Sequence, residues 1–158
     1  MKLSEAKVIA DKYVEMLKPF CKRIEIAGSI RREKPEVGDI EIVCIRNTKY
    51  LRSFCDVVDS LRKVKGSPIG RYTQRVLPEG IKLDLFMCYE DNWGLISAIR
   101  TGSADYSHNV LAMGWVKAGF NSVDGCLFKN GKKVPVYEEE DLFKLIGLKF
   151  VHPTKRNL

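Results

Sequence analysis

The sequence predicts an α+β fold, with a sheet-rich first half and a more helical second half. In the first half, Ile, Val and Leu alternate with polar residues, which is the pattern of half-buried strands. The second half carries longer segments with apolar residues at helical spacing. Gly, Pro, Asn and Asp separate these segments at positions where turns are expected. A length of 158 residues suits one domain or two small lobes.

The elements of the first half follow from these patterns in chain order. Ser4 and Thr48 are expected to cap helices, and the Pro78–Gly80 stretch is expected to turn a hairpin. The expected elements are a helix over 4–20, a strand over 23–28, one helical turn over 30–33, a strand over 38–46, a helix over 48–64 and a hairpin over 71–89.

The second half begins after a soft boundary near residues 89–93. Ser103 is expected to cap its second helix, which should end near Gly119, where glycine commonly terminates a helix. The expected elements are helices over 92–102 and from Ser103 to about Gly119, short strands within 120–136 around two hairpin turns, and a helix over 138–148.

The composition favours an intracellular protein. The N-terminus is amphipathic and charged, unlike a signal peptide, and no apolar run approaches the ~20 residues that span a bilayer. The five cysteines are scattered without a Cys-x-x-Cys pair, so we expect small buried apolar residues rather than disulfides or a zinc site. We therefore expect a cytoplasmic, nucleoid or nuclear location and no secretion.

The chain is basic, with a formal net charge of +7. Such a surface attracts polyanions, of which nucleic acid is the commonest. Positive charge is densest over residues 46–82, and we expect this segment, including Arg71 and Arg75, to neutralise nucleic-acid phosphates. The alternative is that these side chains only keep the surface soluble.

Three acids and one turn carry the chemistry of the first half. Alternation places Asp39 and Glu41 on one face of their strand, where like charges raise each other's pKa unless a cation lies between them. Hard divalent cations such as Mg²⁺ suit a carboxylate pair, although solvated acids on a half-exposed strand are the alternative. The upstream Gly28–Ser29 turn leaves backbone N–H groups for a phosphate. Asp84, between two leucines, is the best candidate for a third acid.

These residues lie in segments that resemble a known family. The stretch "AGSIRRE…GDIEI" is similar to the G-S-x-x-R…G-D-x-D signature of the nucleotidyltransferase superfamily, and specifically of the family X DNA polymerases. The stretches "RTGSADYSHNVLAMGWVKAGF" and "EEEDLFKLIGLKFVHPTKRNL" resemble two further motifs of that family, in the family's order. The resemblance implies a nucleotidyltransferase palm with a mixed β-sheet and flanking helices over 1–90, and a small C-terminal α/β nucleotide-binding lobe over 91–158.

The resemblance also implies roles for particular residues. Asp39, Glu41 and Asp84 would be catalytic and hold two Mg²⁺ ions, for which Mn²⁺ can substitute. The residues implied to bind the nucleotide are Gly28, Ser29, Arg32, Gly38, Arg100, Gly102, Ala104 and Ser107. Lys82 would lie near the primer terminus, and His108 and Asn109 would contact DNA. The partners implied are gapped or primer-template DNA and nucleoside triphosphates, with the protein a monomer.

Departures from the family's pattern qualify the resemblance. Glu41 stands where these polymerases usually have Asp, and Ile99–Arg100 stands where an aromatic pair usually screens the sugar. Ala104 and Ser107 are smaller than usual, which predicts low fidelity. The N-terminal lyase and helix-hairpin-helix domains are not expected.

The function that we expect is a minimal DNA-directed DNA polymerase filling short gaps in DNA repair. The alternatives are a nucleotidyltransferase of the same fold that acts on RNA, a small molecule or a protein, and a non-catalytic nucleic-acid-binding remnant.

Overall fold

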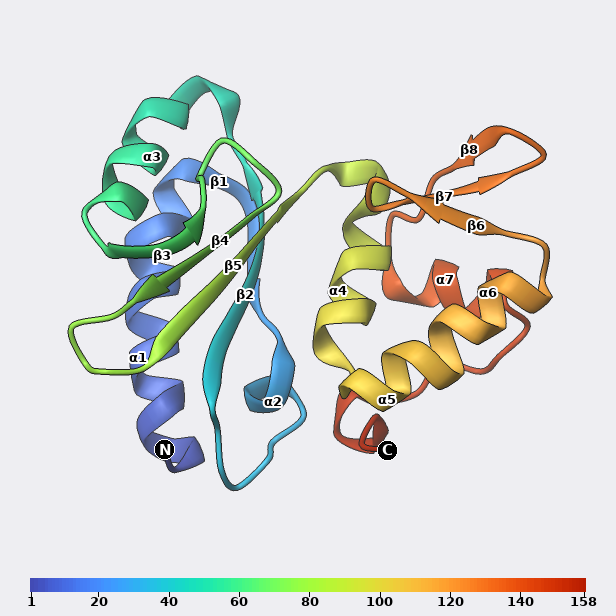
Figure 1. Cartoon of the computed structure of the whole chain (residues 1–158), viewed down its shortest axis with the longest axis horizontal. Helices are drawn as coiled ribbons and strands as arrows, with labels where there is room; N and C mark the ends of the chain where they lie inside the picture. The colour runs from blue at the N-terminus through green and yellow to red at the C-terminus, as the bar shows by residue number, and fades with distance from the viewer. The chain divides into compact units, whose positions relative to one another are not determined.

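The structure is a computed structural model that describes all 158 residues. The chain forms two compact units, Met1–Cys88 and Tyr89–Leu158. Each unit combines helices with a β-sheet of its own, so the predicted α+β class is confirmed (Figure 1). No helix is both long enough and apolar enough to cross a membrane.

The first unit is built on a five-stranded sheet in the order β1-β2-β5-β4-β3. Strands β2 and β5 run parallel and the other neighbouring pairs run antiparallel, so the sheet is mixed. The elements are α1 (Leu3–Leu17), η1 (Lys18–Phe20), β1 (Cys21–Ile26), α2 (Gly28–Arg31), β2 (Asp39–Arg46), η2 (Thr48–Tyr50), α3 (Leu51–Asp59), β3 (Arg62–Gly66), β4 (Tyr72–Val76) and β5 (Lys82–Cys88).

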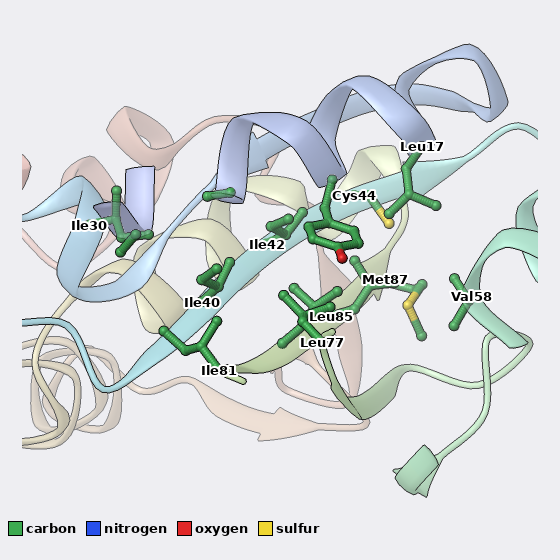
Figure 2. Packing of buried hydrophobic residues seen from close by; sticks show 14 of the residues in the cluster. Leu17, Ile30, Ile40, Ile42, Cys44, Val58, Leu77, Ile81, Leu85 and Met87 are labelled. Atoms are coloured by element: carbon green, nitrogen blue, oxygen red, sulfur yellow. The ribbon is translucent and has the colours of Figure 1, made fainter. Parts of the chain in front are cut away.

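Helices α1 and α3 cover one face of this sheet. The hydrophobic core of the unit lies between these helices and the sheet (Figure 2). Side chains at helical spacing on α1 meet alternate side chains of β2 and β5. Those that are almost completely buried include Tyr13, Leu17, Ile40, Ile42, Phe54 and Leu85. The alternation that sends these residues inward sends the polar residues of β2 and β5 to the opposite face.

The helix expected over 48–64 is too long. A 3₁₀ turn, η2, leads into α3, which ends at Asp59, and Arg62–Gly66 forms the edge strand β3. All five residues of β3 are exposed, so no apolar alternation marks it in the sequence. Pairing with β4 makes this segment a strand, which is a case of tertiary context overriding local preference.

Two expected helix caps are also wrong. Lys2, not Ser4, is the N-cap of α1, and the start of the helix is held by a hydrogen bond from Leu3 N to Pro35 O (3.1 Å). Asn47, not Thr48, caps η2, where its side-chain oxygen accepts from Lys49 N at 3.1 Å. Asn47 meets the capping requirement with its side chain, whereas the side chain of Lys2 makes no capping bond and the backbone of Pro35 accepts instead.

The second unit contains a three-stranded antiparallel sheet in the order β6-β7-β8 together with several helices. Its elements are η3 (Glu90–Asn92), α4 (Trp93–Thr101), α5 (Ala104–Tyr106), the π-helix η4 (Ser107–Ala112), α6 (Met113–Lys117), β6 (Asn121–Val123), β7 (Cys126–Lys129), β8 (Lys132–Val134), α7 (Glu139–Leu145) and η5 (Pro153–Lys155).

The turn chemistry of the second unit agrees with the predictions. Ser103 Oγ accepts from Tyr106 N at 3.1 Å, so the predicted cap is confirmed. The two predicted hairpin turns each have positive φ at both central residues, 52° and 78° at Asp124–Gly125 and 52° and 75° at Asn130–Gly131. This is the backbone of a type I′ turn, which matches the twist of the flanking strands. The π-helical stretch inside the second helix was not predicted.

The five cysteines are all free thiols. Cys44 and Cys88 are buried, and Cys88 Sγ donates to the carbonyl oxygen of Cys44 at 3.6 Å. The other three are partly buried. The expected apolar role therefore holds best for Cys44 and Cys88.

Candidate active site

The three candidate acids lie on the sheet face opposite the core of the first unit. In the parallel pairing of β2 and β5, Asp39 is the partner of Lys82 and Glu41 is the partner of Asp84. Cross-strand partners project to the same side of a sheet, so these four polar side chains form one patch, which we call the acid patch. The apolar residues that alternate with them are buried in the core beneath. The register therefore brings together acids that are more than forty positions apart in the chain.

Asp84 is held by two hydrogen bonds from the neighbouring strand β4. It is 7% exposed, and its Oδ1 atom accepts from Tyr72 Oη at 2.5 Å and from Gln74 Nε2 at 2.8 Å. The Tyr72 ring stacks on Phe86, with ring centroids 5.0 Å apart. Burial of this carboxylate is thus offset in the structure by hydrogen bonds rather than by a paired side-chain cation.

Asp39 interacts electrostatically with Asp84 and Lys82. It keeps contact with solvent, yet desolvation by its surroundings raises its pKa. The negative charge of Asp84 raises this pKa further, and the positive charge of Lys82 opposes the shift. A proton or a cation near Asp39 therefore stabilises the patch.

Glu41 packs against the backbone of the Gly28–Ser29 turn. Gly28 has φ +62°, and a Cβ atom placed on it would lie 2.1 Å from Glu41 Oε2. Burial lowers the pKa of Arg32, and the charge of Glu41 opposes this shift, so the guanidinium and the carboxylate are electrostatic neighbours. Both the positive φ and the close approach of Glu41 require glycine at position 28.

The Gly28–Ser29 turn opens the single-turn helix α2. Ala27 N donates to Glu41 O at 2.8 Å, which ties the start of this turn to β2. Because the first N–H groups of a helix have no partner within it, they are available to a ligand. Gly38, by contrast, has an ordinary φ and open space around a Cβ, so neither requires glycine there.

The donor set fits a hard divalent cation, although its members do not converge on one point. No group of three or more Asp, Glu, His or Cys side chains is close enough to hold a metal ion. Glu41 contributes to this, because its carboxylate lies against Gly28. Asp39, Glu41 and Asp84 are the side chains that could hold Mg²⁺ once Glu41 turns away from Gly28, since carboxylate oxygens are the ligands that this ion prefers.

The candidate nucleotide-binding residues of the second unit surround the end of α4. A Cβ on Gly102 would lie 2.9 Å from Ser107 Oγ and 3.0 Å from the Tyr106 ring, so glycine permits this close turn. Ser107 Oγ donates to Ile99 O at 2.7 Å, and its proton is therefore used within the unit.

The other candidate residues of this unit keep solvent-facing side chains. Arg100, Ala104, His108 and Asn109 are exposed. The last two lie in the π-helix η4, a deviation that is frequent at functional sites.

The structure removes Arg75 from the candidate DNA contacts. Arg75 is 2% exposed, and its guanidinium donates to Thr73 Oγ1 (3.0 Å), Leu61 O (3.2 Å) and Asp59 Oδ1 (3.2 Å). Arg75 projects to the core side of the sheet, and Asp84 projects to the other side. The hydrogen bond from Arg75 to Asp59 therefore ties the end of α3 to the sheet. Arg71 is exposed and remains a candidate.

Tyr72 and Gln74 were not among the site residues predicted from the sequence. A signal was present in the turn predicted at Pro78–Gly80, which in the structure lies within a loop that makes Val76 the partner of Lys82. Counting outwards from that pair places Gln74 opposite Asp84. Hairpin register alone could therefore have found the residues that hold the third acid.

Two comparisons with known proteins bear on this arrangement. Residues 98–157 match the family model of the DNA polymerase beta thumb. The chain is also 29% identical over 99 residues to DNA polymerase IV of Saccharomyces cerevisiae (strain ATCC 204508 / S288c). That match covers 61% of this chain and 17% of the yeast protein, so the chain spans about a sixth of its relative's length.

These matches support the likeness to family X DNA polymerases that the motifs predicted. They support a polymerase-like, DNA-binding class of protein. The thumb match concerns the second unit directly, because residues 98–157 lie within it.

Proposed function

We propose that this chain is a DNA-directed DNA polymerase that extends a primer 3′-OH by nucleotidyl transfer, in short-gap filling during DNA repair. The observation that carries the proposal is the register of β2 and β5, which sets Asp39 and Glu41 beside Lys82 and Asp84. The match of residues 98–157 to a polymerase thumb supports it independently.

The reaction forms a bond between the primer 3′ oxygen and the α-phosphorus of a nucleoside triphosphate. The bond between the α-phosphorus and the α–β bridging oxygen breaks, pyrophosphate leaves, and the hydroxyl proton passes to solvent. Two divalent cations, when bound, supply activation of the hydroxyl and neutralisation of the pyrophosphate charge. The residues of this chain contribute positioning and charge rather than a covalent intermediate.

Each part of the candidate active site has a task in this proposal. Asp39, Glu41 and Asp84 hold the cations, while the Gly28–Ser29 turn and Arg32 bind the phosphates of the incoming nucleotide. A guanidinium suits phosphate oxygens because it can donate two parallel hydrogen bonds. Lys82 is exposed and is the cross-strand partner of Asp39. Its task in this proposal is to neutralise a primer phosphate.

Extension of a primer across a one-nucleotide gap tests the proposal. Each dNTP and rNTP is offered singly, with Mg²⁺ or Mn²⁺. Asp39→Ala is expected to abolish incorporation while the far-ultraviolet circular dichroism spectrum stays unchanged. Asp56→Ala, which removes an exposed acid of α3, is the matched control and should retain activity.

The outcomes separate the competing functions. The polymerase is supported if the natural chain and Asp56→Ala add the nucleotide that the template specifies, while Asp39→Ala adds none. Addition without template dependence favours a nucleotidyltransferase with another acceptor, and DNA binding without any addition favours a non-catalytic remnant. The ratio of dNTP to rNTP incorporation also tests whether Ile99–Arg100, in place of an aromatic pair, relaxes sugar selection.

A further inference from the structure

We propose that Tyr72 and Gln74 are positioning residues that orient Asp84 so that only its Oδ2 atom is presented to a divalent cation. This inference rests on the proposed function, because it assumes that Asp84 is a metal ligand. It adds two residues that no motif and no comparison indicates.

One carboxylate oxygen of Asp84 is already saturated by hydrogen bonds. Asp84 Oδ1 accepts from Tyr72 Oη and from Gln74 Nε2, at 2.5 and 2.8 Å. A carboxylate oxygen has two lone pairs in the plane of the group, so two donors occupy it fully. A cation at Oδ1 would have to displace one of these donors.

The other carboxylate oxygen of Asp84, Oδ2, is open to a cation. Asp84 Oδ2 takes part in no hydrogen bond or ion pair. The fully buried side-chain atoms without a partner are Ser97 Oγ, Tyr106 Oη and Arg156 Nη2. Since Asp84 Oδ2 is not one of them, it keeps an open side, and it is the oxygen that a cation can reach.

The two donors, Tyr72 and Gln74, are held in place by the sheet. Both lie on β4, whose pairing with β5 makes Gln74 the partner of Asp84 and Tyr72 the partner of Phe86. The Tyr72 ring stacks on Phe86, and Lys65 Nζ lies 5.6 Å from its centroid. The phenol is therefore fixed by packing on its neighbours as well as by its hydrogen bond.

Together these contacts define a monodentate ligand. A carboxylate held by neighbouring donors loses little rotational freedom when a cation binds, so the donors strengthen binding without touching the metal. Loss of such an outer partner typically lowers metal affinity by about 10–100-fold. Tyr72 and Gln74 are expected to contribute in this range.

The experiment measures Mn²⁺ binding to the full-length chain without DNA or nucleotide, by electron paramagnetic resonance of free Mn²⁺. The test variants are Tyr72→Phe, which keeps the ring stacking, and Gln74→Met, which keeps the side-chain length. Both should weaken Mn²⁺ binding by about 10-fold or more. Asp84→Asn is included to show that the measured ion binds at this site.

Tyr13→Phe is the matched control. Tyr13 Oη donates to Glu79 Oε1 at 2.7 Å, so this substitution also removes a phenol–carboxylate hydrogen bond of the first unit. Neither residue belongs to the acid patch, and Mn²⁺ binding should be unchanged. In primer extension, the Mg²⁺ concentration for half-maximal rate should rise in Tyr72→Phe and Gln74→Met, with the KM for DNA unchanged.

The results distinguish this inference from the proposed function. If Asp84→Asn weakens Mn²⁺ binding while Tyr72→Phe and Gln74→Met bind as tightly as the natural chain, or more tightly, the positioning role is wrong and the metal assignment stands. If Asp84→Asn leaves Mn²⁺ binding unchanged, the metal assignment itself fails. Thermal unfolding of each variant identifies any that is not folded, and the other test variant then decides.

Discussion

Gly28 shows how a single residue brings the Gly28–Ser29 turn and the acid Glu41 together in the candidate active site. Its φ of +62° lets the chain turn from β1 into α2, and the absence of a side chain lets Glu41 lie against the turn. A Cβ atom on Gly28 would lie 2.1 Å from Glu41 Oε2, 2.7 Å from its Cδ and 3.1 Å from its Cβ. The turn proposed to bind phosphate and the acid proposed to bind metal are thereby in direct contact.

Substitution of Gly28 by alanine tests this contact. Gly80→Ala is the control, because Gly80 has φ +89° but nothing within 4 Å of a Cβ atom. Gly80→Ala should cost about 1–2 kcal/mol of unfolding free energy from backbone strain alone. Gly28→Ala should cost a further ~1–3 kcal/mol because Glu41 must move. Urea denaturation measures both, and equal losses would contradict the close packing of Glu41.

At the scale of elements, β3 places basic side chains on both faces of the sheet edge. Lys65 is the partner of Gln74 and lies over Tyr72, so it projects to the side of the acid patch. Lys63 is the partner of Arg75 and projects to the other side. Strands are spaced about 4.8 Å apart, so Lys65 lies two strands, or about 10 Å, from Asp84. The bulge between Lys63 and Lys65 produces this change of face.

These two lysines give a charge-matched test of DNA binding. Lys65→Ala should lower affinity for gapped duplex and reduce the slope of log affinity against log salt by about 1, since one phosphate contact is lost. Lys63→Ala removes the same charge from the same strand and should leave the slope unchanged. A salt titration by fluorescence anisotropy measures both slopes. Equal changes in the two variants would show that only overall charge matters.

At the scale of the whole molecule, each of the two units has a hydrophobic core of its own. In the second unit, Arg156 fastens the C-terminal segment to this core. Its side chain is 0% exposed, and it donates to Glu139 Oε2 at 2.5 Å and to Val151 O at 2.8 Å. The guanidinium also lies 5.2 Å from the ring centroids of both Phe143 and Phe150.

Arg156→Ala is therefore expected to destabilise the second unit. It breaks a buried ion pair with Glu139, and removal of one member of such a pair costs about 3–5 kcal/mol. Trp93 and Trp115, the two tryptophans of the chain, are both buried in this unit, so tryptophan fluorescence reports its unfolding. The fluorescence transition should shift to lower denaturant in Arg156→Ala. It should stay in place in Lys155→Ala, which removes a neighbouring exposed cation.

Much of the candidate site could be predicted from local sequence because it depends on short-range rules. Alternation along one strand placed Asp39 and Glu41 on a common face, and Asp84 on the outward face of its own strand. The turn residues Asp124–Gly125 and Asn130–Gly131 specified type I′ hairpins, because few residues adopt the positive φ that these turns need. Such features depend on the backbone preferences of a few neighbouring residues.

The remainder required long-range pairing, which leaves no local signal. The parallel register of β2 with β5 makes Glu41 the neighbour of Asp84, and only the folded sheet sets that register. Segment 62–66 is a strand because β4 offers it an edge, and Arg75 is buried because its strand turns it towards α3. The sequence by itself thus determined which acids face outward. Tertiary structure decided which of them meet and which cations remain exposed, because hydrogen bonding between distant strands and burial are properties of the assembled sheet.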